Sequence, residues 1–253
     1  MAKSDSTPKS DRRAVADKLR KQQRRGEKRR NFAIVGVCLF IALLIIGAAA
    51  FQPISSWWNL RQYADASVAD IGASADVCQD VTTKPADGNQ DHVPQGTPMT
   101  YPDSPPAFGT HWENWDGFDS KFYTAADRPE LGMLVHNLEH GYTIMWYDET
   151  VADDSAQMEE IRAIADKFGG SEDLRNKFKA VPWTSEDGDP FPEGQHVALT
   201  RWSTGNGPAV DAGLVPQGEQ TGAWQYCSEP SGAALDEFML EFPYTDSPEP
   251  NAV

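Results

Sequence analysis

The sequence predicts a small α+β domain preceded by a single transmembrane helix. Three observations support this prediction: one long apolar segment near the N-terminus, a few short β-rich runs after it, and amphipathic helical runs between those. The 253 residues contain no internal repeat, no coiled-coil pattern and no glycine-rich phosphate loop. About 200 residues follow the apolar segment, which is enough for one hydrophobic core.

The apolar segment covers residues 32–51 and contains no charged residue, amide or proline. At 1.5 Å rise per residue this length spans roughly 30 Å, the thickness of a bilayer's hydrocarbon core. A cleavable signal peptide is the alternative, because residues 48–50 are small alanines suited to cleavage. The length of the segment and the aromatic residues Phe51, Trp57 and Trp58 after it favour an uncleaved anchor.

Charge is divided unevenly on the two sides of this segment. Residues 1–31 carry 12 Lys and Arg against 4 Asp and Glu, whereas the rest of the chain has a net charge of −24. Basic residues stay on the cytoplasmic side, so we expect a single-pass membrane protein with a cytoplasmic N-terminus and an extracytoplasmic C-terminal domain. The basic tail should lie against anionic headgroups of the membrane. The acidic domain would repel a phosphate backbone, which excludes nucleic acid as its ligand.

The sequence therefore divides into four parts. They are a cytoplasmic basic tail (1–31), a transmembrane helix (32–51), a juxtamembrane connector with a helix expected near 57–71 (52–80), and the extracytoplasmic domain (81–253).

The chain has three cysteines, and two of them lie in the exported part. Thiols tend to oxidise there, so we expect a disulfide between Cys78 and Cys227. Two unpaired thiols that bind a metal are the alternative. Cys38 lies in the apolar segment, where it acts as a small apolar residue.

Within the extracytoplasmic domain, residues 81–127 are rich in Pro, Gly and aromatic residues and show no sustained period. We expect a long irregular loop packed on the core through Tyr101, Phe108, Trp112, Trp115, Phe118 and Phe122. The later segments are more regular. Helices are expected over 132–140, 155–168 and 233–242, and strands over 142–147, 177–183 and 196–202. Gly141 should cap the first of these helices at its C-terminus.

All five histidines lie in the exported part of the chain. His136 and His140 are four residues apart, so on a helix both project from one face and can bind a common ion. His92 and His111 lie in the irregular segment, which can fold over that helix and supply further ligands. Such a set suits copper or zinc. The sequence thus predicts a metal site at these four histidines, the alternative being histidines that are only hydrogen-bonded or solvated.

Residues 136–140 also match the H-x-x-E-H pattern of inverted zinc peptidases, in which the glutamate activates a zinc-bound water. Gly141 and a β-rich run follow at once, so the helix is short for that role. No G-x-S-x-G nucleophile motif is present. A metal-dependent hydrolase with Glu139 as base is therefore a minor hypothesis, and we otherwise assign Glu139 a supporting place behind the ligands.

Several short motifs lie around these histidines. They are His92-Val93, Gly96, Tyr101, Pro105-Pro106, Gly109-Thr110-His111-Trp112, Gly117-Phe118 and Val135-His136-Asn137-Leu138-Glu139-His140-Gly141. Together they resemble the bacterial domain-of-unknown-function family 3105, whose members are often membrane-anchored and common in actinobacteria. The resemblance covers roughly residues 90–245 and weakens after Tyr147, and Thr110 stands where the family pattern has proline.

The resemblance implies the family's fold and placement but no established reaction. It places four family-pattern histidines at His92, His111, His136 and His140, whereas His196 lies outside the pattern. We therefore expect a non-enzymatic accessory or metal-binding protein anchored in the membrane. An assembly subunit of an envelope or respiratory membrane complex is the main alternative, because the chain has an anchor and lacks a recognisable nucleophile.

Overall fold

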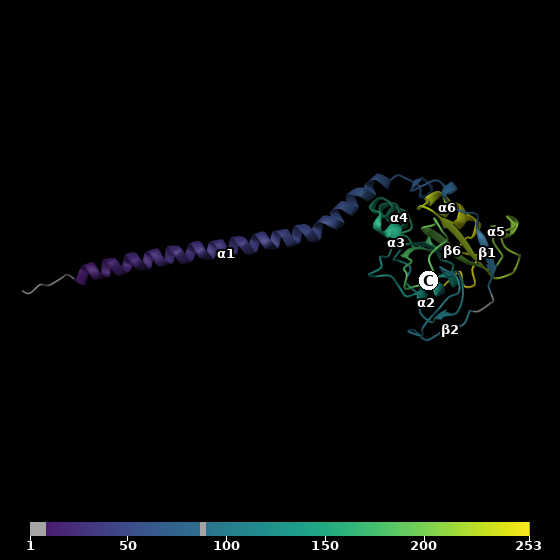
Figure 1. Ribbon diagram of the computed structural model, residues 1–253, viewed down its shortest axis with the longest axis horizontal. Coiled ribbons are helices and arrows are strands. Elements are labelled where there is room, and N and C mark those ends of the chain that lie inside the picture. Colours follow the sequence, from purple (N-terminus) through teal and green to yellow (C-terminus); the bar gives the residue numbers. More distant parts are fainter. Residues whose placement is uncertain (1–8, 87–89, 253) are drawn as a thin grey trace, which may run out of the picture. The chain divides into compact units, whose positions relative to one another are not determined.

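The computed structural model describes residues 9–86 and 90–252 (Figure 1). The chain forms two compact units, Met1–Trp58 and Asn59–Val253. Helix α1 (Lys9–Leu60) makes up the described part of the first unit and ends just inside the second. Its segment Asp17–Gly47 is long and apolar enough to cross a membrane, judged by length and composition.

Helix α1 is longer than the predicted apolar segment. The basic residues before position 32 continue it, since Lys, Arg, Gln and Glu all favour helix. The helix expected near residues 57–71 is not continuous, because α1 ends at Leu60. Short 3₁₀ turns, η1 (Arg61–Tyr63), η2 (Val68–Asp70) and η3 (Ala75–Val77), follow it.

The second unit is a mixed α+β domain, as the sequence predicted. Its five-stranded sheet has the order β1-β7-β6-β4-β5. The strands are β1 (Thr82–Pro85), β4 (Thr143–Tyr147), β5 (Phe178–Pro182), β6 (Val197–Ser203) and β7 (Thr221–Cys227). Only β4 and β5 run parallel to each other, and the other neighbours are antiparallel.

Helices cover both faces of this sheet (Figure 1). Along β4, Met145 and Tyr147 belong to one core, whereas Ile144 and Trp146 belong to the other, as the alternation of a strand requires. The first core includes side chains of α4 (Ser155–Lys167) and α6 (Gly232–Glu241), and the second includes those of α2 (Leu131–Glu139). Shorter helical elements are α3 (Glu149–Asp153), η4 (Leu174–Asn176) and α5 (Pro208–Asp211).

The six helices and strands predicted after residue 131 each match an observed element within two residues. Strands β1 and β7, which pair at one edge of the sheet, were not predicted. Strand β7 contains Gly222, a poor strand former. A Cβ at Gly222 would lie 2.5 Å from the ring of Phe108, so glycine lets that aromatic ring pack on the strand.

The segment expected to be irregular is mostly so in its described parts. Besides β1, it contains only the two-residue strands β2 (His92–Val93) and β3 (His111–Trp112), which pair in parallel. Trp112 is buried as predicted, but the prediction that Trp115 packs in the core is wrong, because its side chain is exposed. Trp115 instead lies against the histidines described below.

The predicted disulfide between Cys78 and Cys227 is present. It joins the segment after η3 to the end of β7 across 149 residues of chain. Cys38 is a free cysteine. The bridge therefore ties the beginning of the second unit to its central sheet.

Candidate metal centre

Helix α2 places His136 and Glu139 on one face, because residues three apart are neighbours on a helix surface. The helix ends at Glu139, and the next residue, His140, is its C-cap with φ −75° and ψ 1°. Gly141 follows with φ +89°, a conformation that favours glycine, and a Cβ there would lie 2.5 Å from the carbonyl oxygen of Tyr244. The predicted glycine cap is thus confirmed.

Strands β2 and β3 bring two further histidines together. Their parallel register sets His92 opposite His111, so both imidazoles leave the strand pair on the same side. Strand β3 comes close to α2 at Gly132, where a Cβ would lie only 2.7–2.8 Å from the indole of Trp112. The missing side chain at Gly132 therefore lets β3 approach the helix that carries the other two groups.

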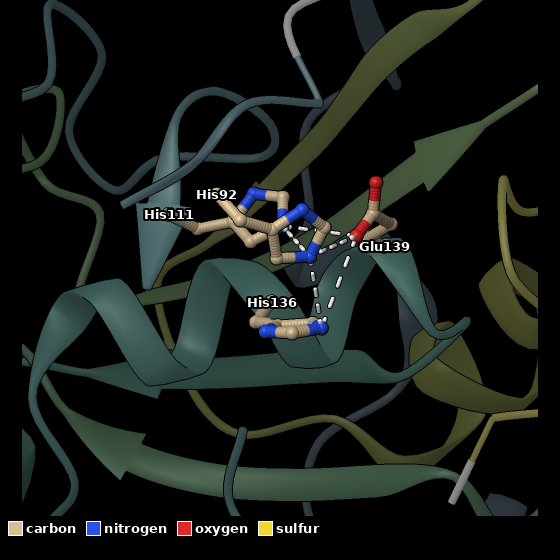
Figure 2. Close-up of side chains that lie close together, drawn as sticks. All are labelled: His92, His111, His136 and Glu139. Carbon is tan, nitrogen blue, oxygen red and sulfur yellow. Dashed lines mark hydrogen bonds and ion pairs between the residues drawn. The ribbon is translucent and has the colours of Figure 1, made fainter. Parts of the chain in front are cut away.

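Figure 2 shows three imidazoles and one carboxylate turned toward a common point. His92 Nε2 lies 3.2 Å from His111 Nε2 and 3.4 Å from His136 Nε2. Glu139 Oε2 lies 2.9 Å from the Nε2 of His111, 3.5 Å from that of His92 and 3.9 Å from that of His136. The four groups come from β2, β3 and α2, which are separate segments of the chain.

These separations match a metal coordination shell. Zinc binds imidazole nitrogen and carboxylate oxygen at roughly 2.0–2.2 Å in a tetrahedron, whose edges are then about 3.3–3.6 Å. Of the five separations between ligand atoms given above, two lie within that range, two are shorter (2.9 and 3.2 Å) and one is longer (3.9 Å). A cation at the centre of the four atoms would need only small side-chain movements to bind all of them.

The backbone fixes which nitrogen of each ring points inward. His111 Nδ1 lies 2.8 Å from the carbonyl oxygen of Gly109, and His136 Nδ1 lies 2.6 Å from that of Trp112. A carbonyl only accepts hydrogen bonds, so each Nδ1 carries the proton and donates. The Nε2 atoms are thereby assigned to the centre, in the arrangement by which metal-binding histidines are commonly oriented.

Glu139 is fully buried and forms its ion-pair contacts, within the described residues, with histidines. Burial alone would raise the pKa of this carboxyl, but its short contact with the His111 ring and the hydrogen bond from Gln90 outweigh burial and lower it. Gln90 donates to Glu139 Oε1 at 2.7 Å and accepts in turn from Gln220 at 2.8 Å. The centre therefore holds a buried negative charge, which the side-chain amides of Gln90 and Gln220 support through consecutive hydrogen bonds. The sequence pattern revealed neither glutamine.

The histidine on α2 is held in its neutral, metal-binding form. Burial is the main cause that lowers the pKa of His136 to about 4, and the neighbouring His111 adds to the effect. His92 differs from the other ligands, since 37% of its side chain is exposed while those of His111 and Glu139 are fully buried. The centre is therefore nearest to solvent on the His92 side.

The structure brings together three of the four predicted histidines and adds Glu139 to them. Glu139, which we predicted to lie behind the ligands, lies within this group. His140 is not part of this group, although its ring lies beside that of His136, with centroids 4.3 Å apart. It falls in a neighbouring group with Glu139 and Glu249. His196, excluded from the predicted site, pairs with Asp148 at 2.8 Å.

Trp115 covers His136 and His140 from the side of the irregular loop. Its ring centroid lies 5.1 Å from that of His136 and 4.8 Å from that of His140. The loop is anchored by two hydrogen bonds, from Asn137 Nδ2 to the Asp116 carbonyl at 2.8 Å and from the Asp116 amide to Asn137 Oδ1 at 3.1 Å. The aromatic side chain thus shields the imidazoles on which it lies.

Comparison with protein-family models gives a match over most of the second unit. The model of a family described as "Protein of unknown function (DUF3105)" matches residues 92–252, which include all four candidate ligands. No curated protein and no solved structure matches the chain.

Proposed function

We propose that this chain, which belongs to the DUF3105 family of proteins of unknown function, binds a divalent transition-metal ion outside the membrane. The ligands are His92, His111, His136 and Glu139. The protein acts as a membrane-tethered, non-enzymatic accessory or metal-handling protein. One observation carries the proposal: four ligand atoms from three separate segments converge, with two of the rings turned inward by backbone carbonyls.

The ligand set favours zinc or copper(II). Imidazole nitrogen suits both ions, and a carboxylate supplies negative charge against the dication. None of these four ligands offers sulfur, the donor that selects copper(I) and iron–sulfur clusters. A bound dication also compensates the buried charge of Glu139, which otherwise depends on hydrogen bonds from neutral groups and on histidines.

The arrangement of Glu139 favours binding over hydrolysis. A general base needs a free oxygen within reach of the water that it activates. Here Oε1 accepts a hydrogen bond from Gln90, and Oε2 lies 2.9 Å from His111 Nε2 at a ligand position. Both oxygens of Glu139 are therefore engaged, and we assign the residue to the metal rather than to proton transfer.

The proposal places the domain on the outer side of a bacterial membrane, with helix α1 as the anchor and the N-terminus in the cytoplasm. The apolar segment, the basic residues before it and the disulfide of the domain support this placement. Trypsin added to intact spheroplasts should then degrade the C-terminal domain. A domain that survives until the membrane is lysed would contradict the orientation.

Metal content tests the proposed centre directly. The full chain is purified in detergent without chelator, dialysed against buffered low free zinc or copper(II), and measured by inductively coupled plasma mass spectrometry. We expect one tightly bound ion per chain. His111→Gln and His136→Gln should each lower its affinity by at least about 100-fold. Losing only a hydrogen bond that orients a ligand already costs about 10–100-fold, and these substitutions remove the ligand itself.

His196→Gln is the matched control, because His196 pairs with Asp148 outside the centre. Circular dichroism shows whether each variant is folded. Metal content that is unaffected by the His111 and His136 substitutions in folded protein, or that the His196 substitution lowers equally, would overturn the proposal.

A further inference from the structure

His140 is a buried imidazole with unmet hydrogen-bonding capacity. Its side chain is only 1% exposed, and within the described residues its Nδ1 has no hydrogen-bond partner. Its Nε2 lies 3.5 Å from Glu249 Oε2, which is longer than an N–H···O hydrogen bond. Burying a polar ring without hydrogen-bond partners costs free energy of folding, and a ligand bound to the ring would offset part of that cost.

The C-terminal segment brings Glu249 to this ring. The backbone N–H of Glu249 donates to the carbonyl of Glu139 at 3.0 Å. Just beyond it, the ammonium group of Lys177 donates to the carbonyls of Pro250 and Ala252 at 2.8 and 2.6 Å, and to that of His140 at 2.7 Å. One buried lysine thus fastens the end of the chain beside the end of α2, where Figure 1 also places the C-terminus.

We propose that Glu139, His140 and Glu249 hold a second divalent cation beside the first. Each carboxylate oxygen of Glu139 has two lone pairs, so this carboxylate, whose oxygens each already have one partner, can still be shared between the two ions. The inference rests on the proposed function, because Glu139 also belongs to the first group. One ligand atom from each of the three residues lies within 4.8 Å of the others. The rings of His136 and His140 are also adjacent, with centroids 4.3 Å apart.

The chemistry of the second group differs from that of the first. It offers two carboxylates and one imidazole, a harder ligand set that suits zinc or manganese(II). The side chain of Glu249 is 49% exposed, so water can fill the remaining coordination positions. The second ion is therefore bound more weakly and exchanges more readily than the first, which has four protein ligands.

Zinc stoichiometry of the full chain in detergent tests this inference. At rising free zinc, the wild-type chain should bind a first ion tightly and a second more weakly, to a total of two. Glu249→Gln should abolish the weaker step and leave the tight one. His140→Gln should do the same, and circular dichroism reports whether this buried variant folds. Glu193→Gln, at an exposed glutamate in the loop before β6, is the control for adventitious binding and should leave both steps unchanged.

The outcomes separate the two proposals. A single tight step that His111→Gln removes and Glu249→Gln leaves intact would overturn the second site and retain the first. A single step that Glu249→Gln removes and His111→Gln leaves intact would overturn the proposed function. A weaker step that Glu193→Gln reduces as much as Glu249→Gln does would show only nonspecific binding to an acidic surface, and would also overturn the second site.

Discussion

Replacing Gly132 with alanine should weaken metal binding while the domain stays folded. The new Cβ would meet three indole atoms of Trp112 at 2.7–2.8 Å, whereas ordinary contacts begin near 3.4 Å. The ring must therefore retreat by about 0.6 Å, and overpacking of this kind costs typically 1–3 kcal/mol. Alanine offsets about 1 kcal/mol through its better helix propensity. The net loss of stability should be about 0–2 kcal/mol.

The displacement of Trp112 should also disturb two of the proposed ligands, His111 and His136. Trp112 follows His111 in β3, and its carbonyl accepts the hydrogen bond that orients His136. Disturbing such a supporting contact costs about 10–100-fold in metal affinity. Zinc titration and urea unfolding of Gly132→Ala measure the two effects. Gly117→Ala is the control, because a Cβ there meets nothing within 4 Å. Wild-type zinc affinity in Gly132→Ala would refute this account of how β3 is positioned.

Three further predictions follow. Gln90→Leu removes the hydrogen bond to Glu139 Oε1 and should lower zinc affinity about 10–100-fold in calorimetric titration. An unchanged zinc affinity would contradict the supporting role of Gln90. Burial lowers the pKa of His140 to about 3 in the fold, against about 6.5 when unfolded, so only the unfolded chain gains this proton between those values. Metal-free protein should thus lose about 2 kcal/mol of stability through this group between pH 6.5 and 5, a loss absent from His140→Gln in urea titrations. An equal pH slope in both proteins would contradict this. Reducing the Cys78–Cys227 disulfide releases a constraint across 149 residues and should lower the free energy of unfolding by about 3–5 kcal/mol, whereas an unchanged melting temperature would show that the bridge does not stabilise the fold.

Hydrophobic periodicity was sufficient to predict the elements that carry a sustained apolar pattern. Helix α4 shows its apolar spacing directly, and β4 is a continuous run of strand-forming residues. Strands β1 and β7 lacked such a signal. The four positions of β1 are all exposed, and Gly222 in β7 makes room for a ring from elsewhere in the chain. Long-range pairing, and not local pattern, determines this edge of the sheet.

The candidate site was partly predictable for a similar reason. Spacing on a helix predicted that the rings of His136 and His140 lie side by side, and they do, with centroids 4.3 Å apart, but His140 is not in the group of four. Glu139, three residues from His136, takes the place beside it. The parallel register that aligns His92 with His111 depends on a strand pair of only two residues, too short to leave a pattern. Gln90 reaches the centre, and Glu249 reaches the ring of His140, through tertiary contacts alone, so sequence spacing carried no sign of them.

The most direct test of the centre is X-ray absorption spectroscopy at the zinc edge, on the full chain in detergent loaded with one equivalent of zinc. The account predicts four nitrogen or oxygen ligands at about 2.0–2.1 Å, with the outer-shell scattering of three imidazoles and no sulfur. His136→Gln should reduce the imidazole contribution to two rings. A spectrum of hydrated zinc without imidazole scattering, or one unaltered in His136→Gln, would contradict the convergence of His92, His111, His136 and Glu139 on a single ion.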